Sequence, residues 1–236
     1  MTIPYPFGIG PKCYMSHWFD IECRRSSVAL ANNTTQFTAF IKSIKVEVVR
    51  FPDYSSYGAV TIRSPMLSTL SCPSRRREYS NGYRYHQINL VGSPFLFSTT
   101  NVFVAVGCNA DASMSQETSE QVGCKSTCKN DTTSIYIWQQ NTSCSTGRNC
   151  CQFRIQPYLQ VYNPSLHSIT VNGNDTQEDD GCKLAFLASE EWLLSMVSDP
   201  SEVRQMDYVP VTLEWMLDVR AEELDKIMRC ESAIYS

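Results

Sequence analysis

Residues 3–14 read Ile3-Pro4-Tyr5-Pro6-Phe7-Gly8-Ile9-Gly10-Pro11-Lys12-Cys13-Tyr14. The prolines fix φ, remove backbone donors and push each preceding residue toward extended geometry, whereas the glycines permit turns with positive φ. Tyr5, Phe7 and Tyr14 supply large apolar side chains, and Cys13 can form a covalent link. The stretch therefore predicts a rigid loop, first extended and then turned, that packs on a core through its rings. Its Tyr5-Pro6 bond is a candidate for the cis form.

Length and charge bound the class of protein. The 236 residues suffice for one large or two small domains, and 19% charged with 11% aromatic residues predicts a folded chain. No apolar run approaches the ~20 residues that a membrane span requires. The net charge of −4 conceals an asymmetry, since residues 1–155 hold 15 Lys and Arg against 9 acids, and residues 156–236 hold 5 against 15. The two halves therefore meet different partners or each other, or the split is ordinary solvated surface.

Cysteine usage indicates the compartment. Eleven cysteines accompany three histidines, which favours a disulfide framework from an oxidising compartment over a zinc site with compact ligand spacing. The disulfide candidates are Cys13, Cys23, Cys72, Cys108, Cys124, Cys128, Cys144, Cys150, Cys151, Cys182 and Cys230. N-x-Ser/Thr sequons mark candidate glycosylation sites at Asn32, Asn33, Asn130, Asn141 and Asn174. Such sites are consistent with an exported protein.

Alternating polar and apolar residues predict short strands along the chain. In the first half they cover residues 19–23, 37–41, 46–49, 59–63, 95–98 and 102–108. In the second half they cover residues 153–156, 159–162, 169–171, 182–187 and 209–217, with helices after Ser189 and over 221–229. The cysteine-rich segment 109–151 predicts a connector with one strand at 135–139. The expected fold class is mainly β: a disulfide-stapled β-rich unit with one or two small helices in the C-terminal half, divided near residue 110.

Sequence signatures of catalysis are missing. We find no His-Glu-x-x-His, Gly-x-Ser-x-Gly, P-loop or kinase motif, and no carboxylate pair of the kind that glycoside hydrolysis needs. His17, His86 and His167 are scattered, which favours surface or packing roles. The acidic run at 174–181 lacks the residue order of a calcium loop, so a solvated loop is the default. The sequence predicts no catalytic residues, no metal site and no cofactor.

One basic and aromatic cluster stands out as a candidate binding site. Its candidate ligand-binding residues are Arg75, Arg76, Arg77, Tyr79, Tyr83, Arg84, Tyr85, Lys42 and Lys45. An Asn81-Gly82 turn predicts a hairpin that puts Tyr83 and Tyr85 on one face and Arg84 on the other. Arginine forks pair with carboxylates and aromatic faces pack on sugar rings, so an acidic saccharide is the matching ligand. A solvated charged loop explains each residue equally well, and nucleic acid is a poor match for an exported chain of negative charge.

The opening stretch also carries a resemblance. Residues 4–14 and the following Trp18-Phe19-x-Ile21-x-Cys23 resemble the start of the galacturonan-binding ectodomain of plant wall-associated receptor kinases. Further matches follow in the same order: Ser71-Cys72, Gly92-Ser93-Pro94-Phe95-x-Phe97-Ser98, Phe103-Val104-Ala105-Val106-Gly107-Cys108, Gly123-Cys124-x-x-x-Cys128, Cys150-Cys151-Gln152 and Val209-Pro210-Val211-x-Leu213-Glu214-Trp215. Because several ordered motifs are far more specific than one, the chain is identified as a member of this family.

The resemblance implies a non-catalytic extracellular region on the apoplastic side of the plant plasma membrane. It implies a galacturonan-binding-like cysteine-rich β domain over 1–110, and over 111–236 a cysteine-rich connector with a β/α domain like the C-terminal one of these kinases. The implied partner is pectin or an oligogalacturonide, with Ca²⁺ entering only through that ligand; the alternative is a protein or peptide such as a pathogen effector. The implied parent is a single-pass membrane protein whose signal peptide and membrane span are absent here. The family has a further cysteine just before the loop, so we expect one unpaired thiol.

Overall fold

The protein is represented by a computed structural model that describes residues 3–25, 37–52, 58–69, 72, 88–115, 121–127, 144, 150–169, 181–196 and 203–216. The expected hairpin at Asn81-Gly82, the strand at 135–139 and the helix at 221–229 lie outside these residues, as do all the sequons. Within the described part the fold is mainly β, with one short α-helix and one 3₁₀ turn. The predicted fold class is therefore confirmed.

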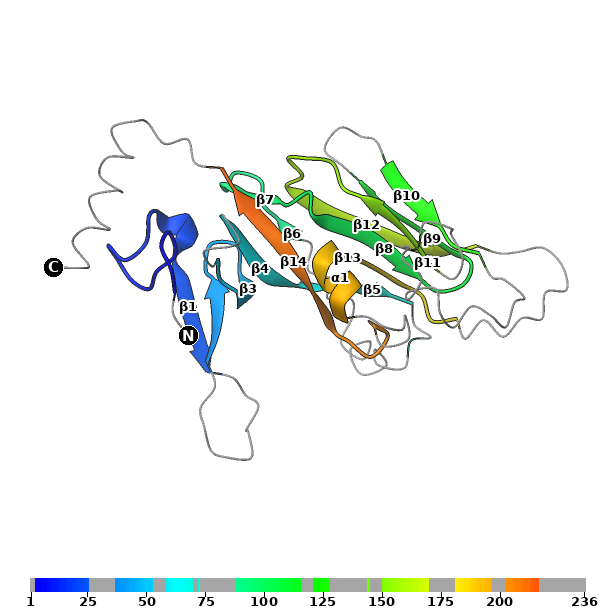
Figure 1. The fold of residues 1–236 in the computed structure, drawn as a ribbon, viewed down its shortest axis with the longest axis horizontal. Helices are drawn as coiled ribbons and strands as arrows, with labels where there is room; N and C mark the ends of the chain where they lie inside the picture. The colour runs from blue at the N-terminus through cyan, green and yellow to red at the C-terminus, as the bar shows by residue number, and fades with distance from the viewer. Residues whose placement is uncertain are drawn as a thin grey trace, which may run out of the picture.

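The strands form an elongated stack of three antiparallel sheets (Figure 1). They are β1 (Ile21–Arg25), β2 (Phe37–Ile41), β3 (Val46–Arg50), β4 (Ala59–Pro65), β5 (Leu67–Ser68), β6 (Ile88–Asn89), β7 (Phe95–Phe97), β8 (Asn101–Val106), β9 (Ala110–Ser115), β10 (Gln121–Lys125), β11 (Cys150–Arg154), β12 (Val161–Ser168), β13 (Leu184–Ser189) and β14 (Tyr208–Trp215). The 3₁₀ turn is η1 (His17–Phe19) and the helix is α1 (Glu190–Met196).

The sheets combine strands that are distant in sequence. The first sheet has the order β1-β2-β3-β4-β14-β7, the second β10-β9-β12-β6 and the third β11-β8-β13-β5. In the first sheet β14 pairs with both β4 and β7, so residues from either side of position 110 share one set of hydrogen bonds. The division of the chain near residue 110 stays a prediction.

Two strands lie in the segment that was expected to be a connector. β9 and β10 pair with each other, and β9 also pairs with β12. The inward residues of β9 are Ala110, Ala112 and Met114, each fully buried, and they alternate with Asp and Ser. Alanine, serine and aspartate have low β propensity, so this alternation gives only a weak strand signal in the sequence.

The opening loop is fixed by backbone hydrogen bonds and by a steric requirement for glycine. Gly8 donates to the Phe19 carbonyl at 3.2 Å and accepts from the Ile21 amide at 2.8 Å, which places the loop beside η1 and β1. A Cβ at Gly8 would lie 1.9 Å from the Cys13 carbonyl oxygen, so a side chain cannot be accommodated there. The Tyr5-Pro6 bond is cis, as the sequence allowed.

Phe7 is the anchor of this loop. Its ring is 1% exposed and lies 5.3 Å from Phe19, 5.5 Å from Phe51 and 5.4 Å from Trp215, measured between ring centroids and in edge-to-face geometry. The expectation that the loop packs through its rings is confirmed for Phe7. It is wrong for Tyr5, which is 46% exposed.

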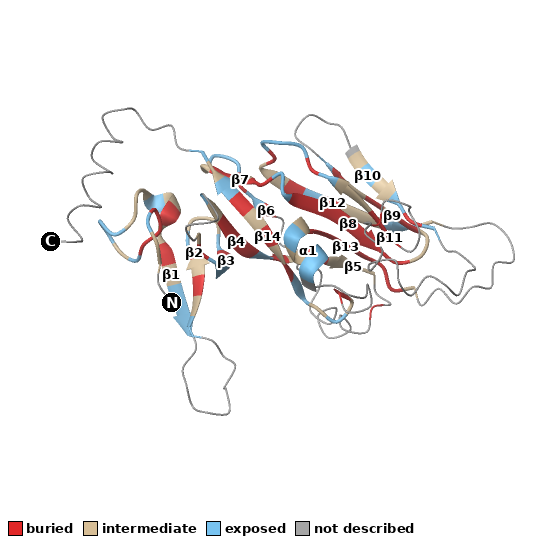
Figure 2. Ribbon diagram, viewed as in Figure 1, coloured by how far each residue is buried: buried red, intermediate tan, exposed pale blue. Residues whose placement is uncertain are grey.

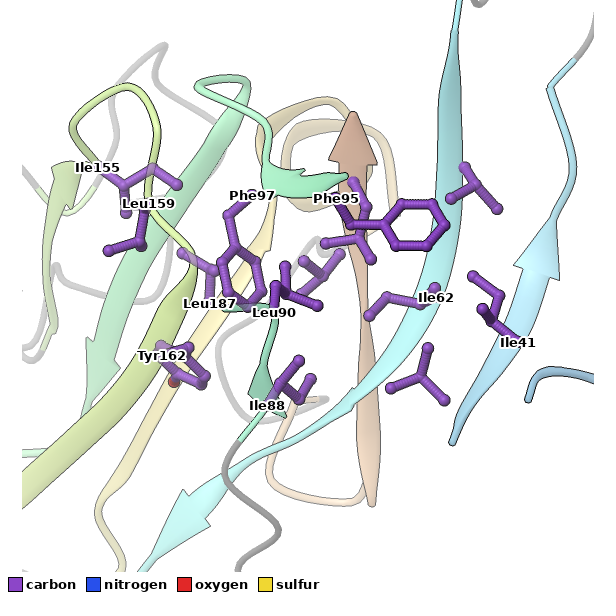
Figure 3. Packing of buried hydrophobic residues seen from close by; sticks show 14 of the residues in the cluster. Ile41, Ile62, Ile88, Leu90, Phe95, Phe97, Ile155, Leu159, Tyr162 and Leu187 are labelled. Carbon is purple, nitrogen blue, oxygen red and sulfur yellow. The ribbon is translucent and has the colours of Figure 1, made fainter. Parts of the chain in front are cut away.

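Two hydrophobic clusters meet at β8 and β13, whose residues are all buried (Figure 2). Alternate residues of these strands face opposite sides, so each strand contributes to both clusters. The first cluster runs from Ile41 and Ile62 through Phe95 to Tyr162 and Leu187 (Figure 3). The second contains four cysteines: Cys72, Cys144, Cys150 and Cys182. Disulfide bonds therefore form part of the second hydrophobic cluster.

Candidate functional site

The described cysteines confirm a disulfide framework. The bonds are Cys72–Cys182, Cys124–Cys151 and Cys144–Cys150, and Cys108 is also disulfide-bonded. Among the described cysteines Cys13 and Cys23 are free and exposed, whereas one unpaired thiol was expected. Cys128 and Cys230 lie outside the described residues. Framework cysteines are typical of oxidising compartments.

Most residues of the predicted binding cluster lie outside the described part of the chain. These are Arg75, Arg76, Arg77, Tyr79, Tyr83, Arg84 and Tyr85, and their arrangement stays a prediction. The residues that flank them are firmly held. Cys72 is fully buried and bonded to Cys182, and Ile88 of β6 pairs with Tyr162 of β12. The segment that carries the cluster is therefore tied to the third sheet at one end and to the second at the other.

Lys42 and Lys45 lie in the turn between β2 and β3, and they differ in how far their charge is engaged. The Lys42 Nζ atom is 3.2 Å from Asp20 Oδ2, and this hydrogen bond raises the pKa of Lys42. Lys45 is exposed, with a left-handed φ of 57°, and no ion pair joins it to the residues that the structure describes. Lys45 is the freer cation of the two.

Arg24 in β1 makes both an ion pair and a cation–π contact. Its guanidinium lies 2.9 Å from Glu22 Oε2 and 4.5 Å from the centroid of the Phe40 ring. The hydrogen bond from Arg24 lowers the pKa of Glu22. Both side chains stand on the open face of the first sheet, so solvent screens the pair.

A groove of about 570 Å³ lies between α1 and the outer face of the first sheet. Its lining residues are Val49, Arg50, Thr61, Arg63, Ser189, Glu191, Trp192, Ser195, Asp207, Tyr208, Val209 and Pro210. Sequence reasoning missed it because its residues come from five separate elements, β3, β4, β13, α1 and β14. The only local signals were the outward positions of the alternating stretch at 209–217 and the polar start of the helix.

Metal and membrane signals are absent from the part of the chain that the structure describes. No group of three or more His, Cys, Asp or Glu side chains there could hold a metal ion. His17 lies 4.6 Å from the Trp18 ring, as expected for a packing residue. No helix among these residues has the length and hydropathy to cross a bilayer.

Comparison with known proteins gives a consistent result. Residues 141–224 match the family model described as wall-associated kinase. The chain is 29% identical over 236 residues to wall-associated receptor kinase-like 6 of Arabidopsis thaliana, covering 98% of this chain and 36% of the relative. It is 34% identical over 229 residues to wall-associated receptor kinase-like 4 of the same plant, covering 92% of this chain and 28% of the relative. No solved structure matches.

The fold and its cysteines define a β-rich, disulfide-linked region of the kind found outside cells. The chain belongs to the wall-associated receptor kinase-like family. It spans about a third of the length of the curated relatives that it matches, from 28% to 36% in these two alignments.

Proposed function

We propose that this chain is the non-catalytic, extracellular ligand-binding region of a plant receptor-like kinase and that it binds pectin or its oligogalacturonide fragments. The observation that carries the proposal is the similarity of nearly the whole chain to wall-associated receptor kinase-like proteins. The disulfide framework supports an apoplastic location, and the sequons at residues outside the described part then carry glycans.

The ligand contacts come from the cluster between Cys72 and Ile88. Arg75, Arg76 and Arg77 pair with galacturonate carboxylates, because a planar guanidinium matches a carboxylate with two parallel hydrogen bonds. The nearby tyrosines, Tyr79, Tyr83 and Tyr85, stack on the sugar rings, and Arg84 adds a fourth cation.

Lysines of the β2–β3 turn extend the cationic surface. Lys45 contributes more than Lys42, because the Lys42 ammonium already pairs with Asp20. In this proposal calcium enters through the pectin ligand, as a bridge between its chains. Binding built on these contacts weakens steeply as the salt concentration rises.

The test is binding of a defined-length, unesterified oligogalacturonide to the chain, measured by titration calorimetry at low and high salt. Changing Arg75, Arg76 and Arg77 together to Ala weakens binding at least about tenfold at low salt, as expected for lost charge-assisted hydrogen bonds. The matched control changes Lys12, Lys125 and Lys129 to Ala, which removes the same net charge elsewhere in the sequence.

Two outcomes decide the proposal. Equal weakening in both triple variants would show a general charge effect and remove the arginine site. No binding by the unchanged chain at any salt concentration would remove pectin as the ligand.

A further inference from the structure

The groove beside α1 is built by elements other than the segment between Cys72 and Ile88. Its floor is the outer face of the first sheet, where Pro210 of β14 lies opposite Arg63 of β4 and Thr212 opposite Thr61. Alternate residues of the same strands, Val211 and Ile62, lie opposite each other and are buried on the inner face. The inner face therefore holds the sheet in place, and the outer face is left for recognition.

A β-bulge directs an extra side chain into this groove. Val48 lies opposite Ile62, but the next pair is Arg50 with Thr61, so Val49 is the inserted residue. The shift puts Arg50 at the register position of the outward-facing Thr61, and both Val49 and Arg50 are exposed and line the groove. Bulges are over-represented near binding sites because they re-aim a side chain in this way.

The helix forms the opposite wall and is held at its first residue and along its buried face. Glu190 donates its amide to the Thr100 carbonyl at 3.0 Å, and its carboxylate accepts from Arg154 at 2.7 Å. Leu193 is 1% exposed and anchors the other face of the helix. Glu191, Trp192 and Ser195 of this helix line the groove. Figure 1 shows where α1 lies in the fold.

We propose that this groove binds a neutral saccharide. Its volume of about 570 Å³ is in the range of small-molecule sites, about 300–1,000 Å³. Trp192 and Tyr208 offer aromatic faces whose negative quadrupole attracts the C–H face of a pyranose ring. Arg50 donates hydrogen bonds, and the carboxylates of Glu191 and Asp207 accept them, which matches hydroxyl groups that do both. The Ser195 hydroxyl donates to the Trp192 carbonyl at 3.3 Å and adds a further acceptor.

The charge of the lining argues against an acidic ligand. Two arginines are balanced by two carboxylates, Glu191 and Asp207, and Arg63 is further engaged by Glu47 at 3.1 Å. A polyanion requires an excess of positive charge, which this lining does not provide. The groove thus suits a neutral ligand, whose binding does not depend on salt, whereas the arginine cluster suits an acidic ligand, whose binding weakens with salt.

The floor also argues against an extended peptide. β3 pairs with β2 and β4, and β14 pairs with β4 and β7, so both strands have neighbours on each side. No free row of backbone donors and acceptors is available there for an added strand. Tyr208 on the floor and Ser195 on the helix, which are both exposed, instead supply lateral contacts to a ring.

The experiment titrates the whole chain with cellohexaose, xylohexaose and mannohexaose, with unesterified hexagalacturonate as the acidic comparison. We expect at least one neutral hexasaccharide to bind with an affinity that salt leaves unchanged. Tyr208→Ala and Arg50→Ala each weaken that binding about tenfold. Matched controls are Tyr158→Ala, a 68% exposed tyrosine, and Leu194→Ala, a 67% exposed residue of α1, neither of which lines the groove.

Trp192 also contacts the second hydrophobic cluster, so Trp192→Phe replaces it while keeping a ring. Melting temperatures of all variants separate lost binding from lost folding. Failure of every neutral hexasaccharide to bind overturns the proposal, as does equal binding by Tyr208→Ala and Tyr158→Ala. A groove that instead binds only hexagalacturonate, or a peptide that competes at Tyr208 without any saccharide binding, also overturns it. If only hexagalacturonate binding is lost, and only in the variant with Arg75, Arg76 and Arg77 changed to Ala, the result concerns the proposed pectin site and not the groove.

Discussion

The region around Phe7 and the region around β8 and β13 both pack chain segments around a buried core, but different contacts hold the segments together. In the first, rings from distant parts of the chain meet around Phe7, and its cysteines, Cys13 and Cys23, are free. In the second, the disulfides Cys72–Cys182 and Cys144–Cys150 lie inside the hydrophobic cluster itself. Both regions are β-sheet packed on a buried core.

The difference follows from the kind of segment that each region must hold. The rings gather strands that hydrogen-bond into one sheet, so backbone pairing already fixes their register. The Cys72–Cys182 disulfide joins the chain after β5 to the chain before β13, where backbone pairing covers only two residue pairs and the Thr69 amide donates to the Lys183 carbonyl at 2.9 Å. A covalent bond there reduces the entropy of the unfolded chain, an effect that grows with loop length.

The largest expected effect tests the covalent region. Changing Cys72 and Cys182 together to Ala removes a bond between residues 110 positions apart and lowers the free energy of unfolding by about 5 kcal/mol. The same change at Cys144 and Cys150, 6 positions apart, costs about 2 kcal/mol. Guanidinium denaturation measures both. Equal losses would show that burial of the sulfurs, and not loop length, sets the stabilisation.

A slightly smaller effect tests the aromatic region. Phe7→Ala removes the ring at the centre of three edge-to-face contacts and lowers the free energy of unfolding by about 4 kcal/mol. Ile9→Ala is the control, because Ile9 lies in the same loop and is 53% exposed; we expect a change within about 0.5 kcal/mol. Similar values for the two variants, from urea denaturation, would mean that Phe7 does not anchor the loop.

The smallest effect concerns pH and the exposed pair in β1. Arg24 lowers the pKa of Glu22 in the folded state, so the unfolded chain takes up a proton first as the pH falls. The stability from this pair is present at neutral pH and is lost as the pH falls from the usual value of 4.5 through the folded pKa. Glu22→Gln and Arg24→Gln should each reduce the drop in melting temperature between pH 7 and pH 3. An unchanged drop in both variants would contradict this.

Strands with bulky alternating residues were predicted well from sequence. β2 has the expected bounds, and β14 buries Val209, Val211 and Leu213 as its alternation indicates. A strand was expected at 159–162, but β12 begins at Val161 and runs without a break through Pro164 to Ser168. Proline lacks a ladder donor and so weakens the strand signal, although here it fits opposite Met114.

The two candidate sites differ in how well they can be predicted from the sequence. The arginine cluster is visible in sequence because its residues are contiguous, and its geometry stays a prediction. The groove depends on a register shift at Val49 and on the pairing of β4 with β14, which no local pattern specifies. Arg50 in particular looks like an ordinary surface residue until the bulge sets its direction.

By itself, the sequence determined the β class, the disulfide chemistry, the resemblance to its family and the anchoring role of Phe7. Each of these depends on residue type, spacing or short-range alternation. The tertiary structure alone decided which cysteines pair, which strands share a sheet and where a groove opens beside α1. Those outcomes depend on contacts between residues far apart in the chain, whose free energies are set by packing in three dimensions and leave no periodic trace in the sequence.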